Sequence, residues 1–500
     1  MKFKTQGIYN DIAITFLVEF TVLAGFFIIY RLLANYFGPD GLGEYSLIKR
    51  LVSLFQPFLF LGFGVGLSRY LAIANDKNQR RGYMQAGGGA IALATLVFLV
   101  IINIFKNQFS SIFFGGNDYV DLVLPFSMLL AGIIFHTLIY SFFRGNLMIG
   151  SFNALQVVNL TLMPVALIFF LRGTDIKELV YSTGWWTLAI SLLFSLYFIK
   201  DIFLWVRDLK KYFIELIKYS FPRFAGDLLL AGIFSFGPII AAHAATIKEV
   251  GYLSVSQSLL SSAGTIVSPL GLILLPKISG LIAKGEKDYV SKKISLLIAA
   301  TVQCSAFLCL QLVIFSDTIV EHWLGPEFLP AVPVMQITFV GVFFYNFYVA
   351  TRSVLDASIV KPVNTINLLA SFIFLALLSF ILAYFFVSIG KIVALNIAFT
   401  IALAFLGIMT YLCIKEVYPE EGYTKDINSF FIGASLSAAI ALIALMLKPL
   451  ITFSIFNLIF FEVVAGLTYL LILFWIRTDW LVAIKDVLIQ ENDYGSKNNN

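Results

Sequence analysis

Charged and chemically reactive side chains are scarce in this sequence. Only 13% of its 500 residues are charged, about half the share of an average soluble domain, whereas 60% are hydrophobic. The three cysteines and three histidines are scattered, without the spacing of a disulfide framework or a metal site. The sequence contains neither a G-x-x-x-x-G-K-[ST] phosphate loop nor a G-x-S-x-G elbow. The composition excludes a soluble catalytic domain, and the missing motifs leave metal, redox and nucleotide-hydrolysing chemistry without support.

Long apolar runs occupy most of the chain and predict transmembrane helices. About 20 apolar residues cross a bilayer as a helix, and runs that are continuously apolar favour helices over the alternating strands of a barrel. Charged or turn-rich breaks separate fourteen runs, at residues 12–37, 45–71, 84–105, 120–143, 152–171, 179–199, 221–242, 250–276, 290–315, 329–351, 363–387, 392–414, 430–447 and 453–476. We therefore expect an all-α integral membrane protein with about 14 transmembrane helices.

The distribution of lysine and arginine predicts the orientation. With the N-terminus inside, 25 of the 34 lysines and arginines fall in inner segments and 6 in outer loops. Cytoplasmic segments of membrane proteins carry this excess. Both termini are therefore expected in the cytoplasm. The net charge of +5 follows from the same topology and gives no reason to expect nucleic-acid binding.

The two halves of the chain match at an offset of 208 residues. Gly43 corresponds to Gly251, Ser46 to Ser254 and Arg144 to Arg352. Such internal repeats are common in transporters, which bind substrate between the repeats. The predicted organisation is an N-terminal six-helix lobe at 1–199, a basic cytoplasmic linker at 200–219, a C-terminal six-helix lobe at 220–415, two accessory helices at 416–476 and a polar cytoplasmic tail at 477–500.

A polar stripe follows one helical face in each half, and we expect both stripes to face a central cavity. In the second span it contains Ser46, Lys49, Arg50, Ser53 and Gln56; in the eighth it contains Ser254, Gln257, Ser258, Ser261 and Thr265. At the 208-residue offset, Lys49 and Arg50 correspond to Gln257 and Ser258. One wall is therefore predicted to be cationic and the other neutral and hydrogen-bonding.

Ionisable residues inside spans are costly, and they usually face a cavity or a partner. Arg31, Lys49 and Arg50 lie within spans; snorkelling to the outer interface is the alternative to a cavity position, and the inward continuation of the stripe favours the cavity. Glu19, in the first span, is a candidate for proton or sodium coupling and equally for a structural counter-ion.

Arg69 and Arg144 fall at inner helix ends. Positive-inside anchoring is the stronger interpretation for both, and an inner gate that receives an anionic headgroup is the alternative. Gly62, Gly64 and Gly66 lack the last glycine of a G-x-G-x-x-G fingerprint, because Arg69 takes its place. These three glycines indicate close helix packing instead.

Six short motifs follow one another along the chain: Tyr36–Tyr45, Leu61–Tyr70, Phe143–Gly145, Tyr219–Arg223, Glu249–Tyr252 and Leu275–Pro276. They resemble motifs of the polysaccharide repeat-unit flippases of the Wzx type. Each motif is short, but their order matches the order of the spans over roughly 400 residues. The family belongs to the multidrug/oligosaccharidyl-lipid/polysaccharide exporter superfamily, and the resemblance implies two six-helix lobes around a central cavity and transport by alternating access.

The resemblance implies a flippase, not an enzyme, that moves an undecaprenyl-pyrophosphate-linked oligosaccharide from the inner to the outer leaflet of the bacterial cytoplasmic membrane. This activity would supply O-antigen, capsule or exopolysaccharide assembly, with the polysaccharide polymerase and export machinery as further partners beside membrane lipid. Lys49, Arg50 and Arg31 would meet the pyrophosphate, and the Ser254, Gln257, Ser258 and Ser261 face would meet the sugars. No cofactor is implied.

Other functions remain open at this stage. A lipid II flippase also needs a cationic cavity, and a cation-coupled multidrug antiporter of the same superfamily would use an acidic group such as Glu19. A cationic wall disfavours the antiporter, because it repels cationic drugs. A membrane glycosyltransferase or polymerase is a weaker alternative, because every loop of this chain is short.

Overall fold

The computed structural model describes residues 5–204, 206–283, 287–359, 361–385, 390–418, 423–448 and 454–476, and these residues form helices and no strand. The helices are α1 (Thr5–Phe60), α2 (Phe63–Ile73), α3 (Lys77–Ile104), α4 (Lys106–Phe113), α5 (Val123–Gly145), α6 (Ile149–Val157), α7 (Met163–Phe170), α8 (Ile176–Ser195), α9 (Ile199–Phe203), α10 (Leu209–Ala244), α11 (Ile247–Ala283), α12 (Lys287–Ile314), α13 (Ser316–Trp323), α14 (Val332–Ser358), α15 (Val363–Phe385), α16 (Lys391–Val417), α17 (Tyr423–Leu447) and α18 (Ile455–Trp475). Short connecting helices are η1 (Asn117–Leu122), the π-helix η2 (Val158–Leu162), η3 (Leu196–Phe198) and η4 (Pro326–Ala331). The all-helical prediction is confirmed.

Eleven helices of the described chain are long and apolar enough to cross a membrane. The first predicted span and most of the second form the two segments of α1, which meet at a kink at Gly38 (φ 63°), and the rest of the second span lies in α2. Glycine tolerates this left-handed conformation, and the following Pro39 is preorganised for the start of a helix, so no loop is needed between the two parts. The fifth predicted span consists of α6, η2 and α7. The thirteenth predicted span lies within α17. The apolar part of this helix, Phe431–Leu447, is shorter than the eleven helices that could cross a membrane.

The chain groups into two compact units by proximity. The first unit contains residues Met1–Val255, Trp323–Glu327 and Gly390–Ile392, and the second contains Ser256–His322, Phe328–Ile389 and Val393–Asn500. The division into lobes at 1–199 and 220–415 stays a prediction, because the two units are defined by contacts between residues and not by the predicted sequence repeat.

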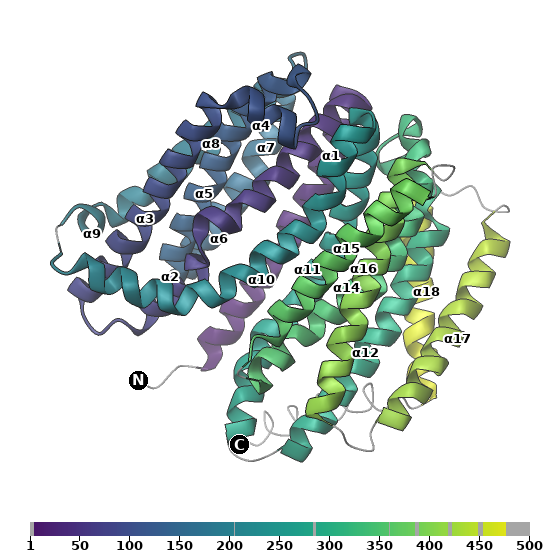
Figure 1. Ribbon diagram of the computed structural model, residues 1–500. Coiled ribbons are helices and arrows are strands. Elements are labelled where there is room, and N and C mark those ends of the chain that lie inside the picture. Colours follow the sequence, from purple (N-terminus) through teal and green to yellow (C-terminus); the bar gives the residue numbers. More distant parts are fainter. Residues whose placement is uncertain are drawn as a thin grey trace. The chain divides into compact units, whose positions relative to one another are not determined.

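In the first unit, α5 packs along α8 and against α1, α2 and α3 (Figure 1). Close packing of α2 on α10 depends on glycine: a Cβ at Gly62 (φ +71°) would lie 2.6 Å from the Ser220 carbonyl oxygen, and one at Gly66 would clash with the Ser220 hydroxyl. The predicted packing role is confirmed for these two glycines. Asp76 directly precedes α3, and its carboxylate accepts a hydrogen bond from the Gln79 amide at 2.7 Å and so caps the helix.

The second unit is built around α12, which packs against α14 and α17. Its core includes Ile294 and Ile298 of α12, Phe347 and Val354 of α14, and Ile414 of α16. α17 and α18, which lie outside the predicted repeat, pack on α12 in a second cluster that includes Ala299, Ile440 and Tyr469. The Tyr469 hydroxyl donates to the Gln303 carbonyl oxygen at 3.0 Å.

Candidate functional site

A cavity of about 470 Å³ lies inside the first unit. Its wall is formed by side chains of α1, α5, α6, η2, α7 and α8. The polar residues that line it are Lys49, Ser53, Gln56, His136, Thr137, Tyr140, Gln156, Asn159, Thr183 and Thr187. Among the described residues lining the cavity, Lys49 is the single lysine or arginine, and none is acidic. A site with one fixed cation and many neutral hydrogen-bonding groups suits a polar ligand with an anionic part.

The second half of α1 supplies the cationic side of this cavity. Lys49, Ser53 and Gln56 follow one another at helical spacing and all line it, as the polar stripe predicts. The Lys49 ammonium lies 5.8 Å from the centre of the Tyr45 ring, and Tyr45 also lines the cavity. The Gln56 amide donates to the Thr137 hydroxyl of α5 at 2.9 Å. The amine of Lys49 therefore has an aromatic neighbour and, within the described chain, no carboxylate at ion-pair distance.

The opposite side of the cavity is a network of neutral polar groups. The Asn159 amide lies 3.1 Å from His136 Nδ1 and donates to the Ser191 hydroxyl at 3.0 Å. His136 is therefore held by a local hydrogen bond. The carbonyl oxygens of the Asn159 and Gln156 side chains and the Thr187 hydroxyl have no hydrogen-bond partner within the described chain. These buried oxygen atoms are therefore left unsatisfied by the described chain.

Sequence reasoning missed most of this neutral wall. Asn153, Gln156 and Asn159 recur every three residues in a run that is otherwise apolar, and that spacing was a usable signal. The π-helix η2 carries Asn159, and such wide turns occur often at functional sites.

Glu19 lies beside the cavity rather than on its wall. Its carboxylate accepts a hydrogen bond from the Gln156 amide at 3.2 Å, and Gln156 does line the cavity. One turn earlier, the Asn153 amide lies 3.4 Å from the Thr15 hydroxyl. Glu19 is thus one hydrogen bond away from the cavity, and both of its predicted roles, ion coupling and structural, stay predictions.

The structure does not bring Arg50 or Arg31 to the cavity wall. Arg50 is 8% exposed, and its guanidinium donates to the Ser254 carbonyl oxygen at 2.9 Å. Adjacent residues on an α-helix point about 100° apart, so Lys49 and Arg50 face different surroundings. Arg31 donates to the Trp323 carbonyl oxygen at 3.0 Å. Both arginines therefore have main-chain partners in this structure, and their contact with pyrophosphate stays a prediction.

The four residues predicted to meet sugars differ in burial. Ser254 and Gln257 are 0% exposed, whereas Ser258 and Ser261 are half-buried on the next turn of α11. The Ser261 hydroxyl donates back to the Ser258 carbonyl oxygen at 2.8 Å. None of these four side chains is among the described residues that line the 470 Å³ cavity.

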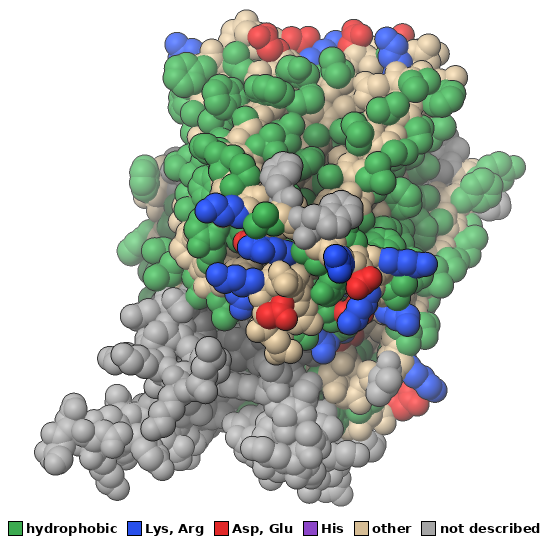
Figure 2. Space-filling model, turned by 90° about the vertical axis from the view of Figure 1, so that its left-hand side faces the viewer, with side chains coloured by type: hydrophobic (Ala, Val, Ile, Leu, Met, Phe, Trp, Pro, Cys, Tyr) green, Lys and Arg blue, Asp and Glu red, His purple; other side chains and the backbone are tan. Residues whose placement is uncertain are grey.

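The two inner-gate candidates, Arg69 and Arg144, are both exposed. The Arg69 guanidinium carbon lies 4.4 Å from the centre of the Tyr219 ring on α10. Figure 2 shows lysine and arginine side chains gathered below a broad hydrophobic surface, on the side of the molecule that carries α9. Basic groups at the edge of an apolar surface are typical of a membrane interface.

The chain is similar to one known protein family and to several solved structures. The polysaccharide biosynthesis protein family matches residues 8–282, more than half of the chain. No curated protein sequence matches it. Among solved structures, the lipid II flippase MurJ in an inward closed conformation is similar with a TM-score of 0.71 at 16% identity, over 96% of this chain and 100% of that one. An inward-facing multidrug resistance MATE family transporter of the MOP superfamily has a TM-score of 0.57 at 15% identity, over 83% and 98% of the two chains.

A third similar structure, that of the MATE multidrug transporter DinF-BH, has a TM-score of 0.57 at 16% identity, over 82% of this chain and 97% of that one. At these identities the likeness establishes the fold, and it agrees with the resemblance of the short motifs. The match to the sequence family establishes membership. The chain therefore belongs to the polysaccharide biosynthesis protein family, and its fold is similar to that of the lipid II flippase MurJ and of the MATE transporters.

Proposed function

We propose that this protein flips an undecaprenyl-pyrophosphate-linked oligosaccharide from the inner to the outer leaflet of the bacterial cytoplasmic membrane, for O-antigen, capsule or exopolysaccharide assembly. The cavity of the first unit carries the proposal, because it combines one cation, Lys49, with a wall of neutral hydrogen-bonding groups. A polysaccharide polymerase and export machinery would act on the product outside the membrane.

The chemistry of the substrate explains why both kinds of wall are needed. A pyrophosphate leaves water only where fixed cations and hydrogen-bond donors replace its hydration. Sugar hydroxyls both donate and accept, so they need neutral groups such as the amides of Gln56, Gln156 and Asn159. Tyr30, Tyr45 and Tyr140 add aromatic surface to the same cavity. The lipid tail can stay in the bilayer while the headgroup is enclosed.

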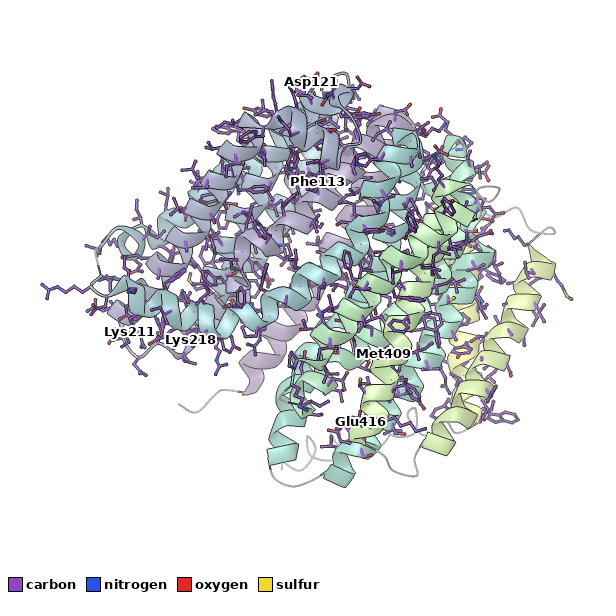
Figure 3. The ribbon with its side chains drawn as sticks, in the orientation of Figure 1. Phe113, Asp121, Lys211, Lys218, Met409 and Glu416 are labelled. Atoms are coloured by element: carbon purple, nitrogen blue, oxygen red, sulfur yellow. The ribbon has the colours of Figure 1, made fainter. Side chains whose placement is uncertain are left out.

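The ends of the first unit support the proposed orientation, with both termini in the cytoplasm. Figure 3 shows Asp121 at one end of this unit and Lys211 and Lys218 at the other. Lys211 and Lys218 lie on the first part of α10, which begins within the predicted inner linker, whereas Asp121 lies in η1, next to a predicted outer loop. The excess of basic groups at one end is the pattern expected of a cytoplasmic face.

Lys49 would act by holding the anionic part of the substrate while the cavity changes its access from one leaflet to the other. A ligand shifts a conformational equilibrium only through a difference in its affinity for the two states. The proposed cycle therefore requires that the contact with Lys49 weaken when the cavity opens outward, so that the product is released.

Substitution of Lys49 tests the proposal. The purified protein is placed in proteoliposomes with a fluorescent lipid-linked oligosaccharide, and the fraction that becomes accessible at the opposite leaflet is followed over time. Removing one charged contact to the substrate is expected to slow translocation by Lys49→Ala about 10- to 100-fold. Lys49→Arg, which keeps the charge, is expected to restore much of the rate.

The matched control is Lys106→Ala, because Lys106 is an exposed lysine of α4 that does not line the cavity. It is expected to translocate at the wild-type rate. A Lys49→Ala protein that elutes as a single folded species and flips the glycolipid as fast as the wild type would refute the proposed role of the cavity.

The hydrogen bond between Gln156 and Glu19 favours a cation-coupled multidrug antiporter as a second candidate, because it connects an acidic group to the cavity. Proteoliposomes that extrude ethidium-like dyes along a cation gradient, without moving the glycolipid, would establish it. The remaining alternative is a lipid II flippase. Expression of this protein in cells depleted of their lipid II flippase distinguishes it from the proposed function, since only a lipid II flippase would restore growth.

A further inference from the structure

Two arginines from different helices meet at one tyrosine ring. The Arg69 guanidinium carbon lies 4.4 Å from the centre of the Tyr219 ring, and that of Arg223 lies 4.1 Å from it. Arg223 also donates to the Tyr219 carbonyl oxygen at 2.9 Å. Because both guanidinium carbons lie within 4.4 Å of the same point, their separation is at most about twice that distance.

This arrangement concentrates positive charge without neutralising it. Arg69 and Arg223 are both exposed, and neither has a carboxylate within ion-pair distance in the part of the chain that the structure describes. Like charges this close repel each other, and an aromatic ring offsets only part of that repulsion. Lys218, next to Tyr219 on α10, is exposed as well. The cluster is therefore suited to an anion with more than one negative charge.

The close packing of two helices, α2 and α10, places the two arginines near each other. Arg69 is on α2 and Tyr219 is on α10, and these helices can approach because Gly62 and Gly66 present no side chain to Ser220. Arg69 is seven residues after Gly62, and Tyr219 directly precedes Ser220. The short distance between the two arginines therefore depends on the close packing of α2 on α10.

We propose that Arg69, Tyr219 and Arg223 form a binding site for the diphosphate headgroup of a lipid at the cytoplasmic surface of the membrane. Planar guanidinium groups bind phosphoryl oxygens through paired hydrogen bonds, and two of them at this separation can share one diphosphate. The site captures the lipid-linked substrate before it enters the cavity; this role and the cytoplasmic location rest on the proposed function and its orientation.

Binding is measured with the full-length protein in nanodiscs. The probes are inorganic pyrophosphate, undecaprenyl diphosphate in the disc, and phosphatidylglycerol in the disc as a singly charged lipid. Arg69→Gln and Arg223→Gln are each expected to weaken binding of both diphosphate probes about tenfold, and the double variant more strongly. Arg69→Lys, which keeps the charge but loses the planar fork, is expected to bind with intermediate affinity.

The matched control is Arg80→Gln, because Arg80 is an exposed arginine of α3 without a described ring or carboxylate partner. It should bind all three probes like the wild type. Wild-type binding of the diphosphate probes by the folded Arg69→Gln, Arg223→Gln double variant would overturn the site. Equal, arginine-dependent binding of phosphatidylglycerol would assign the site to bulk anionic lipid and overturn capture of the substrate.

These outcomes are separable from failure of the proposed function. Lys106→Ala should leave diphosphate binding at Arg69 and Arg223 unchanged, because Lys106 is exposed on α4 and belongs to neither site. Arginine-dependent diphosphate binding by a protein that translocates no glycolipid would refute the proposed function and keep the anion site. Glycolipid translocation that is unaffected by the double variant would refute capture at this site and leave the role of the cavity intact.

Discussion

Gly43 and Gly251, which correspond at the offset of the internal repeat, lie against each other in the first unit. A Cβ added to Gly251 would lie 2.8 Å from the Cα of Gly43, and one added to Gly43 would clash with the Ile247 carbonyl oxygen. Both positions are therefore glycine where α1 and α11 touch. Small residues at such contacts let helix backbones approach closely within a membrane.

Gly43→Ala is expected to destabilise the protein, since the added methyl group meets backbone atoms that cannot turn away. A loss of about 1–3 kcal/mol is expected for such overpacking. The measurement is the apparent melting temperature of the purified protein in detergent. Gly89→Ala is the control, because a Cβ there meets nothing within 4 Å. Equal melting temperatures of the two variants would show that the glycine contact is not tight.

Arg50→Ala is expected to lower stability rather than to affect transport directly. It removes a charged donor from the Ser254 carbonyl oxygen and the cation from the Phe234 ring, 5.7 Å away. A hydrogen bond from a charged group contributes about 1.5–3 kcal/mol. Thermal unfolding should therefore begin at lower temperature for Arg50→Ala than for Lys49→Ala. If Arg50→Ala instead unfolds like the wild type and no longer moves the glycolipid, Arg50 contacts substrate after all.

Arg31 and Trp323 should be energetically coupled. Arg31 donates to the Trp323 carbonyl oxygen, and the Trp323 indole donates to the Phe27 carbonyl oxygen at 2.8 Å. Trp323→Ala keeps the acceptor carbonyl but removes the indole hydrogen bond that positions it, so a double-mutant cycle with Arg31→Ala is expected to give a coupling energy of about 0.5–3 kcal/mol by thermal unfolding. The cycle of Arg31→Ala with Lys448→Ala serves as the control and should be additive. Additivity in the first cycle would contradict the coupling.

Asp317 should make stability depend on acid pH. Burial raises the pKa of its carboxyl, but hydrogen bonds from Lys448 and the Thr318 amide outweigh that effect and hold the pKa below its ordinary value of 3.8. A carboxyl with a lower pKa in the folded state stabilises it above the unfolded pKa, and this contribution is lost as the pH falls through the folded pKa. Melting temperatures should therefore fall below about pH 3.8, and part of this decline should disappear in Asp317→Asn.

Asp118→Asn is the control for this measurement, because Asp118 is an exposed carboxyl for which the structure shows no ion pair in the described chain. It should keep the acid dependence of the wild type. An Asp317→Asn protein with an unchanged decline would contradict the role of the Lys448 contact.

Much of the fold could be predicted because apolar runs of bilayer length leave few alternatives to helices. The breaks between helical segments have local causes. The break predicted between the first two spans is present within α1, because the backbone at Gly38 is not helical and two helical segments meet there. The second predicted span was extended through Leu61 and Gly62, whose left-handed backbone ends α1 and starts α2. The apolar content of a sequence segment does not predict the backbone conformation of its individual residues.

The candidate site could be predicted only in part. The spacing of Lys49, Ser53 and Gln56 predicts one polar face, and all three side chains line the same cavity. The predicted stripe also included Arg50, because a helical face that is defined by polarity alone covers a wide arc of the helix. In the structure the Arg50 guanidinium donates to the Ser254 carbonyl oxygen instead. The neutral wall at Gln156 and Asn159 required knowledge of which helices surround the cavity, and that is a property of tertiary packing.

The bond between Arg31 and Trp323 also has a consequence for biosynthesis. The two residues are 292 positions apart, and the segment Trp323–Glu327 belongs to the first unit. At a translation rate of 5–20 residues per second, Arg31 is made roughly 15–60 s before its acceptor exists. During that interval a guanidinium in a nascent membrane helix lacks its native partner, so insertion machinery or interfacial lipid must accommodate it. The amino-terminal unit therefore cannot reach its final form until nearly two thirds of the chain has been synthesised.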